Sequence, residues 1–489
     1  MSAAPQIYGA DEISAIVLDP GSYTTKVGYA GHDSPLIVSP SYYGEQKGDV
    51  DMDGNGSSEK KLIFDENSLY APKENFEIKP ILKNNMIEDW DGAVEQWKFF
   101  FGRLDVNPAD QPLLITESTL NSYSNKAKAM EVVLEDLQFC AFSLVNQPTC
   151  VSFAHGRPNC LVVDIGHDLV TCTPVVDGIC LKNQVMGVRY AGAYLNQELT
   201  QVLRSRGIDH IDPLYKIKAK NPSYWSKEEF KPDWESRKFD YSISKSFDDF
   251  HNLRVLQEMK ESLLQCTSEI VTGPDTESLT SSSARNFELP NGLNVPFSQK
   301  ERCLLGNSIF SPEKPYTGQE EGIVEGWEEI TDNGNIVNVL GGSKGEKTSK
   351  EYVPLRRSKK GEDEENEDGD KTDASKKLAN KPNGLTEIVN QCLLNLDIDL
   401  KPQLANNIIL SGSTSLIPGL GERLNQELTD LNPGLKIRIH SVGNPVERKY
   451  ASWVGGSILA SLGTFHQLWV SKKEYEEVGA ERLVVSRFR

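Results

Sequence analysis

A strand–turn–strand pattern occurs twice in this chain and limits the folds that the chain can adopt. The first copy, residues 17–31, begins with an apolar run that ends at Asp19, and a glycine follows two residues later. The second copy, residues 161–171, has the same arrangement around Asp164. Runs of β-branched and aromatic residues around a glycine-containing turn predict hairpins. The repeat therefore predicts an internal duplication in which two hairpins face one another across a cleft.

Each predicted hairpin combines a carboxylate with a tight glycine turn, at Gly21 and Gly166. Backbone N–H groups of such turns form concave anion sites, so two turns can hold a polyphosphate from opposite sides. Asp19 and Asp164 would then lie where a hydrated Mg²⁺ bridges to phosphate. One such turn alone is an ordinary hairpin, but a third glycine–hydroxyl turn follows an apolar run at residues 410–414. The chain has neither a G-x-x-x-x-G-K-[ST] loop nor a strand-linked G-x-G-x-x-G.

The length and composition predict a globular protein of two or more lobes. The chain has 489 residues, which is too long for one typical domain. Its net charge of -19 argues against strong direct nucleic-acid binding, although basic partners such as histones stay compatible with it. Its 8 cysteines occur singly, as is typical of reduced intracellular thiols rather than a zinc site. No signal-peptide pattern or long apolar span is present, so we expect neither secretion nor membrane insertion.

The three turns resemble the phosphate and adenosine motifs of the actin, sugar-kinase and seventy-kilodalton chaperone superfamily. Residues 86–91, 114–117, 153–157 and above all 445–462 resemble actin in sequence and in order. This resemblance implies an α/β, actin-like fold of two lobes, each built on a duplicated ribonuclease-H-like mixed sheet, with a nucleotide cleft between them. It implies a first lobe over residues 1–160, with a mobile loop at about 46–61. It implies a second lobe over residues 161–444, with a charged, partly disordered insertion at about 315–382. The C-terminal segment, residues 445–489, would return to the first lobe.

Other features resemble one branch of the superfamily, the nuclear actin-related protein 4 family. They are residues 156–160, the loop 164–168, the charged insertion and the chain end 479–489. The resemblance implies a nuclear subunit shared by NuA4-type histone acetyltransferases and INO- and SWR-class remodellers. It also implies pairing with actin on a helicase-SANT-associated helix of a large subunit, and contact with nucleosomal histones. The basic cluster 356–360 is a candidate import signal, or one of the basic clusters common in charged linkers.

The resemblance implies ATP and Mg²⁺ as cofactors, with Asp19 and Asp164 reaching the metal through water. Lys26 would reach the outer phosphates as a point charge. The predicted nucleotide site comprises residues that match the actin motifs or lie in the matching loops: Asp19, Gly21, Ser22, Tyr23, Thr24, Lys26, Asp164, Gly166, His167, Asp168, Gly192, Lys260, Glu261, Ser411, Gly412, Ser413, Thr414 and Lys449.

The chain departs from actin beside the phosphates. Tyr23 stands where actin has glycine, Ile165 replaces a serine, and His167-Asp168 replaces Asp-Gly. Gln147 matches a glutamine that helps to orient the hydrolytic water in actin, but Thr171 stands where the partner histidine should be. Because general-base assistance is worth roughly 10²–10⁴-fold in rate, we expect ATP to be a structural ligand that is hydrolysed little or not at all. We expect His167 to fill space or to contact phosphate. The alternative is that His167 replaces the missing histidine as the general base.

Two surfaces bear on partners. The loop 46–61 matches actin's filament contact but has no apolar anchor, so we expect no self-polymerisation. The apolar C-terminal stretch matches actin's groove between its lower subdomains and could receive an amphipathic helix, although some of its members would only pack the terminal helix. An active ATPase or small-molecule kinase, and a cytoskeletal actin-related protein, are the alternative functions. The predicted groove residues are Ile458, Leu459, Leu462, Thr464, Phe465 and Leu468.

Overall fold

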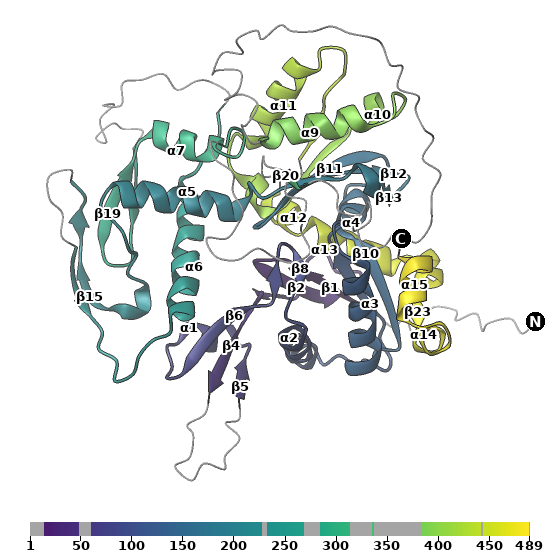
Figure 1. The fold of residues 1–489 in the computed structure, drawn as a ribbon, viewed down its shortest axis with the longest axis horizontal. Helices are drawn as coiled ribbons and strands as arrows, with labels where there is room; N and C mark the ends of the chain where they lie inside the picture. The colour runs from purple at the N-terminus through teal and green to yellow at the C-terminus, as the bar shows by residue number, and fades with distance from the viewer. Residues whose placement is uncertain are drawn as a thin grey trace, which may run out of the picture.

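Two β-sheets, one in each half of the molecule, form the centre of the fold (Figure 1). The computed structural model describes residues 14–47, 60–226, 232–267, 284–312, 383–441 and 444–488, and the backbone of 335–336. The ribbon in Figure 1 shows the chain passing from the sheet of the first lobe to that of the second, and its C-terminal helices lie beside the first sheet again. The predicted return of the C-terminal segment thus corresponds to strand β23 joining the first sheet.

The first sheet has the strand order β23-β10-β9-β1-β2-β3. Neighbours among β1, β2 and β3 run antiparallel, whereas β9 and β10 run parallel to β1. Every residue of β1 and β9 is buried, as expected for the central strands of a sheet covered on both faces. The strands are β1 (Ile16–Pro20), β2 (Thr24–Tyr29), β3 (Ile37–Pro40), β9 (Leu113–Glu117), β10 (Ala141–Asn146) and β23 (Val470–Ser471).

The second sheet repeats this path in the order β20-β14-β12-β11-β21-β22, with β13 also paired to β12. Here β11, β12 and β14 are antiparallel neighbours, and β21 and β22 run parallel to β11. The repeated topology confirms the predicted actin-like fold with a duplicated mixed sheet. The strands are β11 (Cys160–Ile165), β12 (Val170–Val176), β13 (Ile179–Cys180), β14 (Met186–Val188), β20 (Asn335–Ile336), β21 (Ile408–Ser411) and β22 (Ile439–His440).

Helices α4 and α13 pack against each other between the two sheets. α13 also contacts β1 and β9, while α4 contacts strands of both sheets. A Cβ atom at Gly455 of α13 would lie 1.7 Å from the Cys150 carbonyl oxygen of α4, so only glycine allows this close approach. The helices of the first lobe and of the C-terminal segment are α2 (Trp90–Arg103), α3 (Tyr123–Glu131), α4 (Gln147–Ala154), α12 (Pro445–Lys449), α13 (Ala451–Ser461), α14 (Lys472–Val478) and α15 (Ala480–Arg487).

Helices of the second lobe bury their apolar faces in its core, which is the largest group of packed apolar side chains in the described chain. They are α5 (Gly192–Ser205), α6 (Lys245–Leu263), α7 (Gln299–Asn307), α9 (Leu385–Asn395), α10 (Lys401–Ala405) and α11 (Leu420–Leu431).

The outer part of each lobe has small sheets of its own. In the first lobe, β4, β5 and β6 form one sheet and β7 pairs with β8; in the second lobe, β15 pairs with β17, and β16, β19 and β18 form another sheet. Figure 1 shows β6 close to the end of α6, where the outer parts of the lobes meet. The elements are β4 (Tyr42–Lys47), β5 (Lys60–Ile63), α1 (Glu66–Tyr70), β6 (Phe76–Pro80), β7 (Leu82–Lys83), β8 (Met86–Ile87), β15 (Ile217–Asn221), β16 (Ser223–Tyr224), β17 (Asp233–Ser236), β18 (Arg285–Glu288) and β19 (Leu293–Phe297).

Helix boundaries differ from the pattern in the sequence where a cap residue decides them. Helical periodicity is clear only from Leu253 onward, yet α6 begins at Lys245 because the Ser244 hydroxyl accepts a hydrogen bond from Phe247 N at 3.3 Å. α3 likewise begins at Tyr123, after the N-cap Ser122, and continues into one π-helical turn over Val132–Asp136.

Two predicted segments lie largely outside the described residues. Gln46 and Lys47 belong to β4, and Lys60 and Lys61 to β5, so the predicted loop is narrower than 46–61; residues 48–59 are not described. Of the insertion at 315–382, only the strand β20 is described, and the cluster 356–360 lies outside the described residues. All eight cysteines lie in described segments and carry free thiols, seven of them buried. Among the described helices, none is both long and apolar enough to cross a membrane.

Candidate functional site

The three glycine turns of the sequence meet at one cavity between the lobes. Fifteen of the predicted nucleotide residues line it: Asp19, Gly21, Ser22, Tyr23, Thr24, Lys26, Asp164, Gly166, His167, Asp168, Glu261, Ser411, Gly412, Ser413 and Lys449.

The other three predicted residues, Gly192, Lys260 and Thr414, lie behind the cavity wall rather than on it. Lys260 Nζ donates a hydrogen bond to the Gly192 carbonyl at 3.0 Å, and Thr414 Oγ1 donates to the Gly166 carbonyl at 2.8 Å. In this arrangement they brace the second hairpin and the start of α5, instead of facing a ligand directly.

The two hairpins that face the cavity have the same internal geometry. Gly21 N bonds to Thr24 O at 3.2 Å in the first turn, and Gly166 N bonds to Leu169 O at 2.9 Å in the second. A Cβ atom on Gly21 would lie 3.0 Å from Thr24 O, and one on Gly166 would lie 3.1 Å from Leu169 O. A side chain at either position would crowd a carbonyl oxygen of its own turn, which favours glycine in each copy of the motif.

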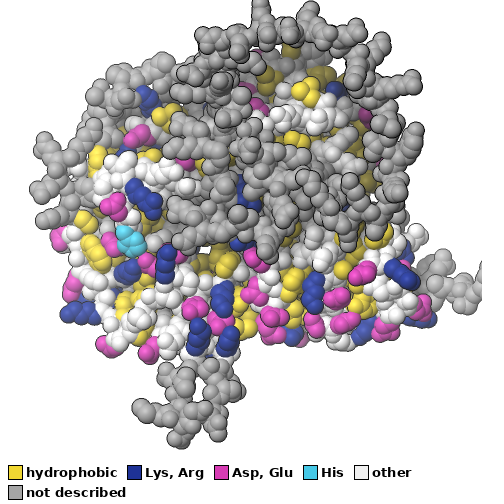
Figure 2. Space-filling view, viewed as in Figure 1, with side chains coloured by type: hydrophobic (Ala, Val, Ile, Leu, Met, Phe, Trp, Pro, Cys, Tyr) yellow, Lys and Arg dark blue, Asp and Glu magenta, His cyan; other side chains and the backbone are white. Residues whose placement is uncertain are grey.

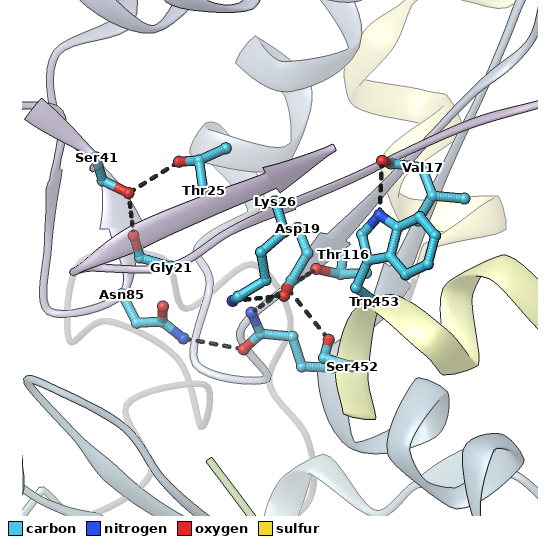
Figure 3. A network of polar contacts seen from close by, with 11 residues as sticks. Val17, Asp19, Gly21, Thr25, Lys26, Ser41, Asn85, Thr116, Ser452 and Trp453 are labelled. Carbon is cyan, nitrogen blue, oxygen red and sulfur yellow. Dashed lines mark hydrogen bonds and ion pairs between the residues drawn. The ribbon is translucent and has the colours of Figure 1, made fainter. Parts of the chain in front are cut away.

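Asp19 is the centre of a hydrogen-bond network at the end of β1 (Figure 3). Lys26 Nζ reaches its carboxylate at 2.9 Å, Gln147 Nε2 at 3.1 Å and Ser452 Oγ at 3.2 Å, and the Thr116 hydroxyl also donates to it. Burial acts to raise the pKa of Asp19, but the Lys26 charge and the hydrogen bonds from Thr116, Lys26 and Gln147 outweigh it, so the pKa lies below its ordinary value. Asp19 is thus a permanent carboxylate at neutral pH.

Asp164 is the corresponding residue of the second hairpin, and its pKa is shifted in the opposite direction. Burial, together with the charge of Asp19, raises its pKa to about 6, although a hydrogen bond from Ser411 and the charge of Lys26 act to lower it. A cation beside the two carboxylates would relieve this repulsion, and carboxylate oxygens are ligands that Mg²⁺ prefers. The residues present therefore fit a hydrated Mg²⁺, although no group of three or more potential ligand side chains occurs among the described residues.

Tyr23 and His167, the two bulky departures from actin, contact each other across the cleft. Their ring centroids are 5.1 Å apart and the planes are inclined by 36°. Burial, and next the charge of Lys260, lower the pKa of His167 to about 3. A ring that takes up a proton only near pH 3 is a weak general base at neutral pH, so the geometry favours a packing role over the alternative of a replacement base.

Four further residues line the cavity that the sequence did not single out: Asn85, Leu169, Gln257 and Ser452. Asn84 and Asn85 take left-handed φ values of 51° and 59° in the β7–β8 turn, and an Asn-Asn pair is a turn signal that could have drawn attention to this segment. Gln257 lies one helical turn before Glu261 on α6 and donates to it at 2.5 Å, so helical spacing from Glu261 could have found it.

The predicted partner groove divides into buried and exposed members. Leu459 and Phe465 are buried and pack with Trp453, whereas Ile458, Leu462 and Leu468 are 39%, 40% and 54% exposed, and Thr464 is exposed as well. The packing interpretation thus holds for two of the six. Phe153 on α4, the helix that packs against α13, and Ile179 on β13, which contacts α4, are also exposed, and the sequence did not suggest them.

Comparison with known proteins agrees with this geometry. The family model described as Actin matches residues 10–489. Three fungal relatives named "Actin-related protein 4" align over almost their whole length. The one from Candida albicans is 41% identical over 99% of this chain and 98% of its own; that from Saccharomyces cerevisiae is 39% identical over 100% of both; that from Schizosaccharomyces pombe is 33% identical over 98% of both.

Proposed function

Because the chain belongs to the actin family and to its actin-related protein 4 branch, we propose that it holds ATP with Mg²⁺ between its lobes as a structural ligand. The observation that carries this proposal is the meeting of two matching hairpins, with Asp19 and Asp164, at one cavity. Lys26, already paired with Asp19 at 2.9 Å, places a positive charge beside the phosphate positions. Bound Mg²⁺ would offset phosphate charge and the repulsion between the two carboxylates.

We propose that hydrolysis is slow or absent. Thr171 lines the cavity where actin has a histidine, and a hydroxyl cannot replace imidazole as a general base near neutral pH. Gln147, which would orient water, is bonded at both ends of its amide: it donates to Asp19 at 3.1 Å and accepts from Asn85 at 2.9 Å. A ligand that binds only the folded state stabilises that state whether or not it turns over.

We further propose a nuclear, non-filamentous subunit of chromatin-modifying complexes of the NuA4, INO and SWR types, which pairs with actin and contacts nucleosomal histones. Its support is the family membership and an exposed apolar strip at Ile458, Leu462 and Leu468 that suits an amphipathic helix, such as a helicase-SANT-associated helix. Positive and negative side chains are interspersed on the described surface in Figure 2, and the net charge is -19, so we propose no strong direct binding to nucleic acid.

Radiolabelled ATP tests the ligand proposal directly. Purified protein is incubated with Mg²⁺ and γ-labelled ATP, and both the retained nucleotide and the released phosphate are recorded, with Asp164→Ala beside it. We expect retention without release, and loss of retention in the variant. Steady phosphate release that depends on Asp164 would favour an active ATPase instead. Retrieval of actin and of histones from nuclear extract, compared with the Ile458→Asp variant, tests the assembly proposal.

A further inference from the structure

We propose that the protein's own contacts hold the two lobes closed over the cavity, so that an enclosed nucleotide leaves only when the outer end of the cleft opens. The part of this inference that concerns release rests on the proposed function, while the closure itself concerns protein contacts alone. Three sets of contacts join the lobes, at increasing distance from the cavity.

The first contact is made by Asp168, which replaces a glycine of actin. Its carboxylate, in the turn between β11 and β12 of the second lobe, accepts a hydrogen bond of 3.0 Å from the backbone nitrogen of Asn84 in the first lobe. The Ser22 hydroxyl also donates to it. Asn85 N bonds to the Ser22 hydroxyl at 3.0 Å, so the first hairpin, the β7–β8 turn and the second hairpin form one connected unit. The Asp168 carboxylate thus links the second hairpin to the first hairpin and to the β7–β8 turn without any ligand.

The second contact is the ring pair of Tyr23 and His167. The two side chains come from opposite hairpins, and their centroids lie 5.1 Å apart. Because both rings are largely buried and the imidazole is neutral, their separation would expose apolar ring surface to water.

The third contact is an aromatic cluster at the outer end of the cleft, which we call the outer cluster. From the first lobe, Phe76 packs on Phe247 of α6 with centroids 5.7 Å apart, and Tyr42 packs on Phe250 at 5.2 Å. Members of the cluster share one apolar core: Ile63, Leu69, Phe76, Ile78, Tyr215, Phe247 and Phe250, with Tyr42, Tyr70, Phe239 and Ile243 packed against it.

Polar groups complete the outer cluster. Ile78 N donates to the Ser246 hydroxyl at 3.1 Å, and Ser244 Oγ donates to the Phe76 carbonyl at 2.5 Å. Tyr241 donates to the Pro72 carbonyl at 3.0 Å. The Arg254 guanidinium of α6 lies 3.6 Å from the centre of the Tyr70 ring, a cation–π contact between the lobes.

Opening of the cleft would therefore expose a buried apolar core, as local unfolding does, and would not merely separate two hydrated surfaces. Apolar side chains of both lobes would have to leave a common buried cluster, and backbone groups of β6 would lose their hydrogen-bond partners Ser244 and Ser246 at the start of α6. Rare openings of this kind control the escape of an enclosed ligand. No member of the outer cluster lines the cavity, so changes in the cluster leave the ligand contacts intact.

Release of a fluorescent etheno-ATP, chased with excess ATP, tests this inference. Phe250→Ala opens the outer cluster and should accelerate release roughly 10- to 100-fold. Phe139→Ala is the matched control, because Phe139 is also buried but lies in the core of the first lobe, away from the cleft. Ser246→Ala, which removes only the partner of Ile78 N, should give a smaller acceleration with little loss of stability. Equal release rates in wild type and Phe250→Ala, or equal acceleration by Phe139→Ala, would overturn the inference.

Hydrogen exchange of the nucleotide-free protein separates closure from ligand binding. We expect the Ile78 amide to be protected without nucleotide, and to lose protection in Phe250→Ala but not in Phe139→Ala. If the protein retains no ATP, the proposed function fails, yet a protected Ile78 amide would still support closure. Exchange of that amide at the rate of an open β-strand edge would refute closure, whatever the nucleotide result.

Discussion

Asn85 donates a hydrogen bond of 2.9 Å to the side-chain oxygen of Gln147, the glutamine that in actin helps to orient the hydrolytic water. The nitrogen of the same amide donates to Asp19 at 3.1 Å. With both ends engaged, Gln147 has one fewer acceptor direction to offer a water molecule. Loss of hydrolysis in this chain would then have two causes, the threonine at position 171 and the tethered glutamine.

These two causes predict an interaction between substitutions. We expect Thr171→His alone to change phosphate release by less than about threefold, because the glutamine stays tethered, and Thr171→His with Asn85→Gly to raise it by roughly 10²-fold. Glycine suits position 85, where φ is 59°. Single-turnover phosphate release is the measurement, and Asn84→Gly in place of Asn85→Gly is the control. If Thr171→His alone raised phosphate release by roughly 10²-fold, the hydrogen bond from Asn85 would not be what restrains Gln147.

Asp164→Asn should change ligand binding and stability in opposite directions. Burial of its charge raises the pKa of Asp164 to about 6, so the neutral amide should stabilise the protein without nucleotide and metal by about 1–3 kcal/mol at pH 7.5. The same change should weaken Mg²⁺-dependent ATP retention at least about tenfold, since a metal-facing carboxylate is lost. Urea unfolding and equilibrium binding measure the two effects. The control Asp399→Asn, at an exposed residue, should change neither stability nor binding. If Asp164→Asn stabilises the protein but still retains ATP like the wild type, Asp164 does not belong to the ATP site.

Lys260 should make stability depend on pH above neutrality. Its ammonium is buried, and burial lowers its pKa from 10.5 to about 7, against the charge of Glu261. Between these values the unfolded chain binds the proton and the folded protein does not, so stability rises with pH and is lost as pH falls towards 7. Relative to Lys260→Met, the wild type should gain about 2 kcal/mol between pH 7.5 and 9.5. Urea unfolding gives the stability at each pH. The control Lys128→Met, at an exposed lysine, should show the same pH dependence of stability as the wild type. If Lys260→Met also shows that dependence, the lowered pKa of Lys260 would be contradicted.

The buried ion pair between Glu117 and Lys126 should matter far more than an exposed pair of equal length. Their charged atoms are 2.8 Å apart and the side chains are at most 5% exposed, while Glu95 and Lys98 have the same separation with both side chains nearly half exposed. Glu117→Gln leaves a buried ammonium without its partner and should cost about 3–5 kcal/mol. Glu95→Gln should cost less than about 1 kcal/mol. Chemical denaturation measures the free energy of unfolding of both variants. If both lost a similar amount of stability, burial would not determine how much an ion pair contributes.

The exposed strip at Ile458 and Leu468 should bind a partner helix without contributing much to the fold. Ile458→Asp should weaken binding of a helicase-SANT-associated peptide at least about tenfold while the melting temperature stays within about 2 °C. Ile398→Asp, at a side chain 81% exposed on the second lobe, is the matched control. Fluorescence anisotropy gives the Kd values. Equal affinities for both variants would place the peptide elsewhere.

Local sequence determined the parts of the site that depend on neighbouring residues along the chain. Hairpins close over a few residues, so Asp19 with Gly21, and Asp164 with Gly166, could be predicted together with their tight turns and their duplicated sheets. We also expected some members of the actin-like C-terminal stretch to pack in the terminal helix, and Leu459 and Phe465 are buried there. Apolar periodicity is clear in α6 only from Leu253, although the helix begins at Lys245, after the Ser244 cap.

Contacts between distant segments were decided only by the tertiary structure. The spacing along the chain could not show that Asn84 would reach Asp168, that Tyr23 would meet His167, or that Lys260 would bond to Gly192 instead of lining the cavity. These contacts join residues from different lobes or from opposite sides of a core, and their distances and burial depend on how whole sheets and helices pack. The sequence alone therefore determined the chemistry of the two hairpins, whereas packing between the lobes determined which groups face the cavity and how tightly it is enclosed.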